Sequence, residues 1–153
     1  MSKITIKGKH PSFILQFDKK GEQQLEVVRG LSYHYEMFAL FGLINVGQAA
    51  QRLGVTLNNG KSTFFDYRIP TINVGIPEVA MHLFNKFKNG SFISYDNDID
   101  YSLLAKAFYR LGRIPELSSY DFTAKGDLVL TESTKNPNSI FEESVRIINI
   151  GQF

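Results

Sequence analysis

The sequence predicts an α+β fold, a single domain over residues 1–153 in which a mainly antiparallel sheet packs against three or four helices. Three observations lead to this prediction. Apolar and polar residues alternate near the N-terminus, which is typical of strands. Several later segments repeat apolar residues at helical spacing, and Asn-Gly or Lys-Gly pairs between segments predict tight turns.

The first part of the chain is expected to form the sheet. Ile4 and Ile6 alternate with polar residues, and segments 12–17 ("SFILQF") and 23–28 ("QQLEVV") favour two more strands. The segment between them, "DKKGE" at 18–22, has the Asp, Lys and Gly residues that hairpin turns prefer. We therefore expect an antiparallel hairpin here.

A helix is predicted next, over residues 32–44. Ser32 is a suitable N-cap, and apolar residues follow it at helical spacing. Asn45 predicts a break, after which residues 46–53 ("VGQAAQRL") read as a short second helix that ends at Gly54. The sequence thus predicts two consecutive helices in this region.

Regular elements are also predicted in the second half. Helices are expected over 76–90 and 96–112, with a strand at 91–95 ("SFISY") between them. A Lys-Gly pair predicts a hairpin over 119–133. Residues 136–153 are ambiguous, because the pattern fits either a helix or a closing strand.

An internal similarity accompanies these elements. "INVG" occurs at 44–47 and at 72–75, and each copy is followed by an Asn-Gly turn and an aromatic run. The pattern predicts a helix–turn–strand unit that is duplicated over 44–67 and 72–95. The alternative is that strand ends and helix starts simply recur.

Residues 47–68 also resemble a helix-turn-helix motif. "VGQAAQRL" and "KSTFFDYR" would be its second and third helices, with the last one facing DNA, and "MFALFGLI" at 37–44 would be the supporting helix before them. The connection through "GVTLNNG" is longer than the usual turn, and "KSTFFDYR" is a poor helix former. We therefore favour a turn at Asn58–Gly60 followed by a strand over 62–69.

Chemistry-bearing residues are sparse. The chain has no cysteine, and His10, His34 and His82 lack the spacing of metal ligands, so His82 is interpreted as a histidine at the edge of the core. Asp96, Asp98 and Asp100 alternate, and we interpret them as a helix cap rather than a cation site. The sequence therefore predicts no catalytic residue, no metal ligand and no cofactor.

The functional prediction follows by exclusion. We expect a non-enzymatic cytoplasmic protein that binds another protein or itself, such as an inhibitor, an immunity-type protein or a subunit of a phage- or plasmid-encoded assembly. No signal peptide or membrane-spanning stretch is apparent, so no membrane partner is expected.

Two other functions are compatible with the sequence. Nucleic-acid binding is the alternative, either through the helix-turn-helix-like region at 47–68 or through strand aromatics flanked by Lys and Arg, and basic residues are in excess over the first 95 residues. A metal-dependent hydrolase that uses Asp96 and Asp98 is a third, weaker hypothesis. The candidate contact residues for a partner or a nucleic acid are Lys19, Lys20, Lys61, Phe65, Tyr67 and Arg68.

Overall fold

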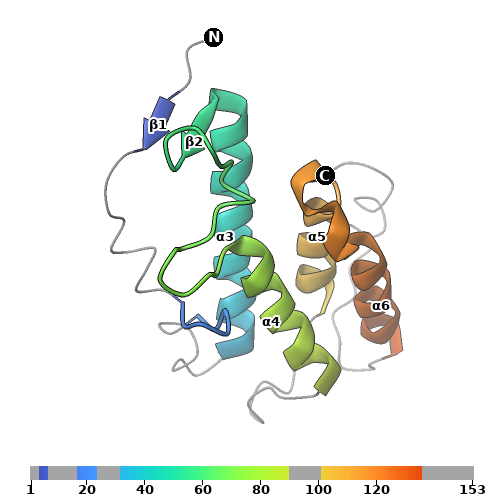
Figure 1. The fold of residues 1–153 in the computed structure, drawn as a ribbon. Coiled ribbons are helices and arrows are strands. Elements are labelled where there is room, and N and C mark those ends of the chain that lie inside the picture. The colour runs from blue at the N-terminus through green and yellow to red at the C-terminus, as the bar shows by residue number, and fades with distance from the viewer. Residues whose placement is uncertain (1–3, 7–16, 24–31, 90–100, 136–153) are drawn as a thin grey trace.

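The protein is mostly helical (Figure 1). The computed structural model describes residues 4–6, 17–23, 32–89 and 101–135. Among these residues, sheet pairing is limited to two three-residue strands, and the core is built mainly from four helices. The prediction of a mainly antiparallel sheet packed against helices is therefore wrong.

Helix α3 (Ser32–Leu53) is continuous, although the sequence predicted two helices separated at Asn45. One face of α3 buries Met37, Leu40 and Ile44 in the core. Burying a large apolar side chain contributes about 2 kcal/mol, whereas a glycine inside a helix costs about 1 kcal/mol. Burial thus outweighs the helix-breaking residues. A single helix also removes the first two helices of the helix-turn-helix interpretation.

The two strands lie at the C-terminal end of α3 (Figure 1). Strand β1 (Ile4–Ile6) pairs with strand β2 (Val55–Leu57), which follows α3 directly. The pairing is parallel, so the strand at the N-terminus is confirmed but its expected antiparallel neighbour is not.

The turn at Asn58–Gly60 is confirmed. Its three residues have positive φ angles of 53°, 56° and 83°, which Asn and Gly tolerate better than other residues. Leu57 and Ser62 exchange two backbone hydrogen bonds of 2.9 and 3.2 Å across the turn. The chain therefore reverses direction here, as the sequence predicted.

Residues 62–69 do not form the predicted strand, and they do not form a reading helix either. Asp66 Oδ1 accepts the backbone N–H of Thr63 at 2.7 Å, and the N–H of Tyr67 donates to the carbonyl of Thr63 at 3.1 Å. Such local bonds compete with a strand ladder for the same backbone groups. This part of the chain is an irregular loop that runs over α3 to the start of α4.

Helices α4 (Ile76–Asn89) and α5 (Ser102–Leu111) confirm two predictions of the sequence. Helix α4 buries Val79, Leu83 and Phe84. The strand predicted at 91–95 lies outside the described residues.

The hairpin predicted over 119–133 is wrong. A 3-10 helix, η1 (Pro115–Tyr120), is followed by helix α6 (Phe122–Lys135). Phe122 and Val129 are buried at helical spacing, and Gly126 lies close to Ala105 and Phe108 of α5. Gly126 therefore lies inside a helix that packs on α5, whereas the sequence pattern had indicated a turn.

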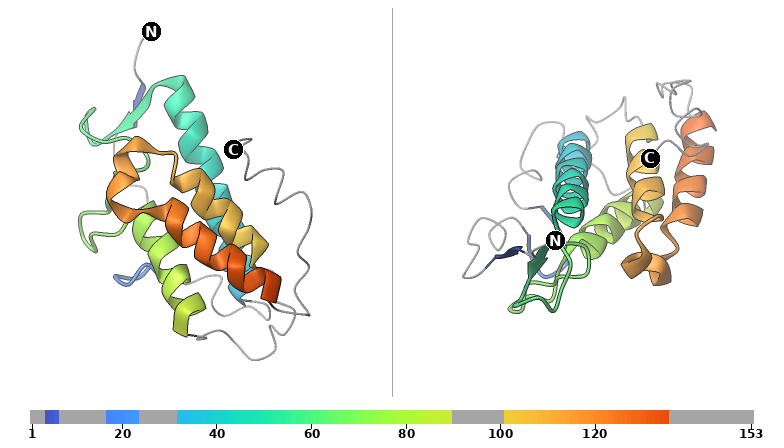
Figure 2. Two further views of the ribbon diagram at one scale, coloured as in Figure 1. Left: turned by 90° about the vertical axis from the view of Figure 1, so that its right-hand side faces the viewer. Right: turned by 90° about the horizontal axis from the view of Figure 1, so that it is seen from above.

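Helix α3 packs against α4 and α5, and α5 packs against α6. Helices α5 and α6 lie side by side and run in opposite directions (Figure 2). A row of aromatic rings crosses the core, in which Phe84 contacts Phe108 at 5.7 Å and Phe108 stacks on Phe122 at 5.5 Å between ring centroids. This row links α4, α5 and α6.

Other predictions are only partly covered by the described residues. Of the N-terminal hairpin, the turn is described, and Phe17 and Gln23 form an antiparallel bridge. In the proposed duplication, residues 44–47 are helical and residues 72–75 are not, while the segment from 90 to 95 lies outside the described residues. The duplication therefore stays a prediction. No described helix has an apolar stretch long enough to cross a membrane.

Candidate functional site

A hydrogen-bonded cluster around Glu78 joins three elements at the first turns of α4. Glu78 Oε2 accepts hydrogen bonds from Arg68 Nη2 and from the hydroxyl of Tyr120, each at 2.7 Å. Arg68 Nη2 also contacts the Tyr120 hydroxyl. Glu78 Oε1 accepts the backbone N–H of Gly75 at 2.8 Å. We call Arg68, Gly75, Glu78 and Tyr120 the Glu78 cluster, and it holds one carboxylate by both of its oxygens.

Arg68 is positioned by the loop between β2 and α4. Phe65 is fully buried and anchors this loop on α3, where its ring lies against Gly47. Beyond Arg68, the buried residues Ile69 and Val74 form an antiparallel bridge that closes the loop. Arg68 therefore lies between two anchored points, which limits the conformations of its backbone.

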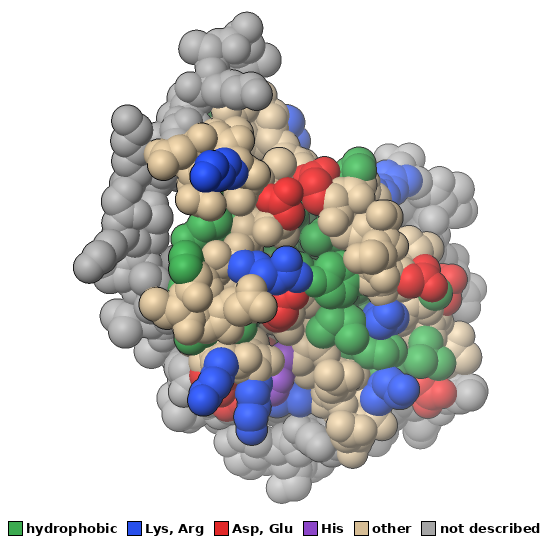
Figure 3. All heavy atoms as spheres, viewed as in Figure 1, with side chains coloured by type: hydrophobic (Ala, Val, Ile, Leu, Met, Phe, Trp, Pro, Cys, Tyr) green, Lys and Arg blue, Asp and Glu red, His purple; other side chains and the backbone are tan. Residues whose placement is uncertain are grey.

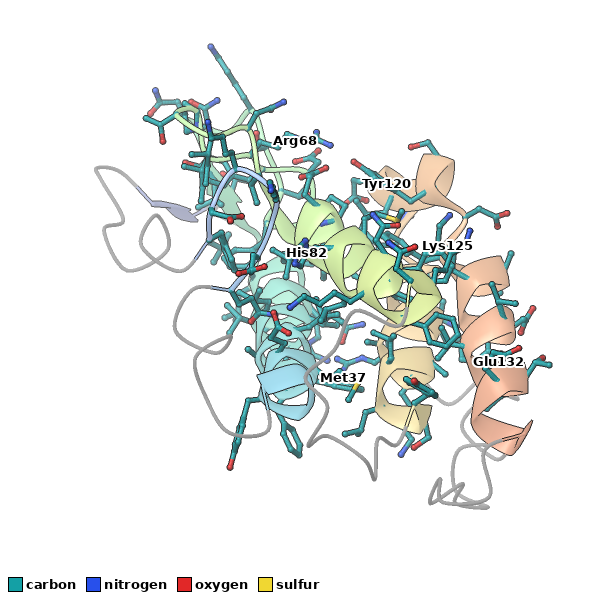
Figure 4. The ribbon with its side chains drawn as sticks, turned by 90° about the horizontal axis from the view of Figure 1, so that it is seen from below. Met37, Arg68, His82, Tyr120, Lys125 and Glu132 are labelled. Atoms are coloured by element: carbon teal, nitrogen blue, oxygen red, sulfur yellow. The ribbon has the colours of Figure 1, made fainter. Side chains whose placement is uncertain are left out.

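Tyr120 is positioned by the aromatic row of the core. Its ring stacks on Phe122 with 5.3 Å between centroids and 9° between planes. Lys125 Nζ donates to the carbonyl of Tyr120 at 2.5 Å. Seen from below, Arg68, Tyr120 and Lys125 lie around α4, which carries His82, while Met37 and Glu132 belong to α3 and α6 (Figure 4).

His82 lies one helical turn after Glu78 on the same side of α4, since residues four apart are neighbours on a helix. Its Nε2 is 3.3 Å from Glu22 Oε2, which belongs to the turn at 17–23. Nε2 is buried and makes no hydrogen bond of good geometry within the described residues. Glu22 therefore faces one ring nitrogen of His82, as a carboxylate that orients an imidazole would.

Lys86 follows one turn later and pairs with a buried carboxylate. Lys86 Nζ is 3.0 and 3.2 Å from the two oxygens of Glu36, whose side chain is 0% exposed. Gln23 donates to the backbone carbonyl of Glu36 at 2.9 Å. Glu78, His82 and Lys86 thus form a polar stripe along α4, and each of them contacts a different element of the fold.

The environment fixes the charge of these groups. Burial, together with the nearby charge of Lys86, lowers the pKa of His82, so the imidazole is neutral at pH 7. Burial and the hydrogen bond to Glu78 raise the pKa of Tyr120, which therefore keeps its proton. The hydrogen bond to Glu78 raises the pKa of Arg68 and keeps it charged. The site combines a neutral base, a protonated phenol and a cation.

Lysines and arginines surround this site on the surface. Figure 3 shows the face concerned, where the purple histidine lies among blue Lys and Arg side chains and beside a green apolar area. Lys19 and Lys20 belong to the turn at 17–23, and both are exposed. The face thus offers positive charge next to apolar surface.

The six contact residues predicted from sequence lie at different places in the structure. Arg68 is in the Glu78 cluster, and Lys19 and Lys20 lie on the turn that contacts α4. Lys61 is exposed near the turn at Asn58–Gly60, while Tyr67 is half-buried against the core. The prediction that Phe65 contacts a partner is wrong, because its side chain is 0% exposed and faces Gly47.

Sequence reasoning missed Glu78 and Tyr120. The polar stripe was visible in the sequence, because Glu78, His82 and Lys86 recur every four residues inside an amphipathic helix. Tyr120 gave no such signal, since it reaches the cluster only through the packing of η1 and α6. Asp96, Asp98 and Asp100 lie outside the described residues. Among the described residues, no group of three potential ligands could hold a metal ion.

One protein family matches part of the chain. A model of the alginate lyase family matches residues 9–64, a little over a third of the chain. The matched region includes the turn at 17–23, the whole of α3 and the beginning of the loop that carries Arg68. No curated protein and no solved structure matches the chain.

This similarity corrects the functional prediction from sequence. The matching family consists of enzymes that degrade a polysaccharide, which contradicts a non-enzymatic binding protein. It gives no support to an inhibitor, an immunity protein or a phage or plasmid subunit. The prediction depended on metal and nucleophile motifs, and such motifs do not reveal a cluster of Arg, Tyr and His side chains from separate segments.

Proposed function

We propose that the protein is a polysaccharide lyase that acts on an anionic, uronate-containing polymer such as alginate. Two observations support this proposal: the match of residues 9–64 to the alginate lyase family, and the Glu78 cluster. The cluster carries the argument, because Arg68 and Tyr120 already hold a carboxylate, the group that every sugar of a uronate polymer presents.

Arg68 is suited to bind a substrate carboxylate. Its two side-chain contacts within the described residues both use Nη2, and its side chain is 38% exposed. A guanidinium has five N–H donors, so others remain for a second carboxylate. Neutralising the carboxylate of a uronate makes the proton on the adjacent carbon easier to remove, which an elimination requires.

His82 and Tyr120 supply the acid–base chemistry in this proposal. Glu22 faces Nε2 of His82, which leaves Nδ1 as the atom that accepts the proton from the carbon next to the carboxylate. The electrons of that C–H bond form a carbon–carbon double bond as the bond to the glycosidic oxygen breaks. The hydroxyl of Tyr120 gives its proton to the departing oxygen. Solvent then takes the proton from His82 and returns one to Tyr120.

The matched region and the proposed site are in physical contact. Glu22 lies inside residues 9–64 and contacts His82, which lies outside them. Gly47 and Phe65 similarly link α3 to the loop that carries Arg68. The segment that resembles the lyase family thus supports the side chains to which we assign the reaction.

The purified protein should be incubated with alginate, and with the neutral polymer dextran as a control. Elimination creates a double bond conjugated to the carboxylate, so the ultraviolet absorbance of the product should rise with alginate alone. Arg68→Ala and His82→Gln should each reduce the rate by about 10²-fold or more. New reducing ends without the absorbance would indicate hydrolysis and would refute the lyase assignment.

The predicted cytoplasmic location and the predicted protein partner are separate proposals. Fractionation of the native cells tests the location, and the hydrodynamic size of the purified chain tests self-association. Neither outcome alters the chemistry assigned to Arg68, His82 and Tyr120.

A further inference from the structure

The turn at 17–23 has a rigid internal structure. Asp18 Oδ1 accepts the backbone N–H groups of Lys20 at 2.8 Å and of Glu22 at 3.0 Å, and the N–H of Gly21 donates to the carbonyl of Asp18 at 3.0 Å. The ends of the turn, Phe17 and Gln23, pair with each other and are buried. The conformation of the turn is therefore set by its own hydrogen bonds and anchored in the core.

The same turn lies directly on the helix that carries the proposed site. Gly21 has a φ of +85°, and a β-carbon at this position would lie 2.7 Å from the carbonyl oxygen of Glu78. The backbone of the turn therefore touches the backbone of α4 at Glu78. Glu22 adds a side-chain contact to His82, one helical turn further along.

Lys19 and Lys20 are consequently held beside the Glu78 cluster. Both are exposed, and within the described residues neither side chain pairs with a carboxylate. Arg68 reaches Glu78 from the loop before α4, whereas the two lysines directly precede Gly21, whose backbone touches α4 at Glu78. Two segments that carry positive charge thus contact the same turn of α4, and such an arrangement attracts a polyanion.

We infer that Lys19 and Lys20 form a second carboxylate-binding subsite, which takes a uronate sugar next to the one bound by Arg68 on the same polymer chain. This inference rests on the proposed function. It assigns to the turn the role of selecting long anionic substrates, because a subsite beyond the reacting sugar is occupied only by chains of several sugars. The subsite contributes to binding and takes no part in the proton transfers.

The test compares two double variants that each remove two positive charges. Lys19→Gln/Lys20→Gln alters the subsite, and Lys88→Gln/Lys106→Gln is the control. Lys88 lies ten residues beyond Glu78 on α4, about 15 Å along the helix, and Lys106 is on α5. Binding of alginate oligosaccharides of increasing length is measured by calorimetry at low and high salt, together with KM and kcat on polymeric alginate.

The inference predicts that Lys19→Gln/Lys20→Gln weakens binding of long oligosaccharides by roughly tenfold at low salt. Binding of the shortest oligosaccharide should be unchanged, KM should rise and kcat should stay the same. The loss should shrink at high salt, because exposed charges are screened. The control variant should behave like the wild type.

The experiment distinguishes a failure of the subsite from a failure of the proposed function. If the wild type cleaves alginate but both double variants lose the same affinity, the subsite is wrong and the proposed function stands. If Lys19→Gln/Lys20→Gln lowers kcat on the shortest substrates, these lysines act in the reaction and the subsite is again wrong. If the wild type neither binds nor cleaves alginate, the subsite and the proposed function fail together.

Discussion

Gly47 of α3 lies directly against the ring of Phe65, so that a β-carbon at position 47 would be 2.6 Å from the nearest ring atom. Phe65 is fully buried and anchors the loop that carries Arg68. This contact is therefore the point at which the longest described helix fixes the proposed site. Gly42 lies in the same helix, but a β-carbon at position 42 would meet nothing within 4 Å.

The two glycines give a matched pair of substitutions. Gly47→Ala should destabilise the protein by about 1–3 kcal/mol, because the added methyl group overpacks the contact with Phe65. Gly42→Ala should stabilise it by up to about 1 kcal/mol, because alanine favours the helix and meets no neighbour. Urea denaturation measures both free energies of unfolding, and shifts of the same sign would contradict the packing described here.

Glu78→Gln tests the cluster as a structural element. The substitution keeps the shape of the side chain but removes the charge that Arg68 and Tyr120 contact. Because both Arg68 and Glu78 are partly exposed, we expect a loss of about 1 kcal/mol in the free energy of unfolding. Chemical denaturation with and without 1 M salt, roughly the concentration that reduces the Debye length to 3 Å, measures the loss and its electrostatic part. No difference from the wild type would mean that the cluster does not hold the loop.

Lys86→Gln should be more costly, since it removes the ammonium group that lies 3.0 Å from the buried carboxylate of Glu36. Removing one partner of a buried pair costs about 3–5 kcal/mol. Combining it with Glu36→Gln should recover part of the loss, because the buried charge that Lys86 contacts is then gone as well. Thermal denaturation of the two single variants and the double variant gives the coupling, and fully additive losses would contradict the pair.

His82 gives a pH dependence of known sign. Its pKa in the folded protein lies below the ordinary value of 6.5, so the unfolded chain binds the proton more readily. The stabilisation is complete above pH 6.5 and is lost as the pH falls from there through the folded pKa. Urea midpoints from about pH 7 to 5 should show this loss. It should disappear in His82→Gln and persist in His10→Gln/His34→Gln, and a loss that persists in His82→Gln would contradict the assignment.

Local patterns predicted several elements correctly. Helices α4 and α5 and the turn at Asn58–Gly60 follow from amphipathic spacing and from residues that tolerate positive φ. The end of α3 before Gly54 also follows, because Gly54 has a φ of 70°. These features depend on neighbouring residues, which a single sequence displays.

Contacts between residues far apart in the sequence could not be predicted from local patterns. Gly126 looked like a turn residue, and only the packing of its segment against Ala105 and Phe108 shows that it lies inside a helix. The site also depends on long-range packing, because Arg68 and Tyr120 are 52 residues apart in sequence and different parts of the core hold them in place. The sequence identified Arg68 as a contact residue but gave no means to find its partners.

The central claim is that the hydroxyl of Tyr120 takes part in the cleavage of a uronate polymer. Tyr109 provides a matched control, because its hydroxyl also donates to a carboxylate, that of Asp127, and burial likewise raises its pKa. The most direct measurement is the rate of unsaturated product release from alginate by the wild type, Tyr120→Phe and Tyr109→Phe. We predict that Tyr120→Phe lowers kcat by about 10²-fold or more, while Tyr109→Phe retains the wild-type rate. Equal rates for the two variants, or no unsaturated product from the wild type, would contradict the account.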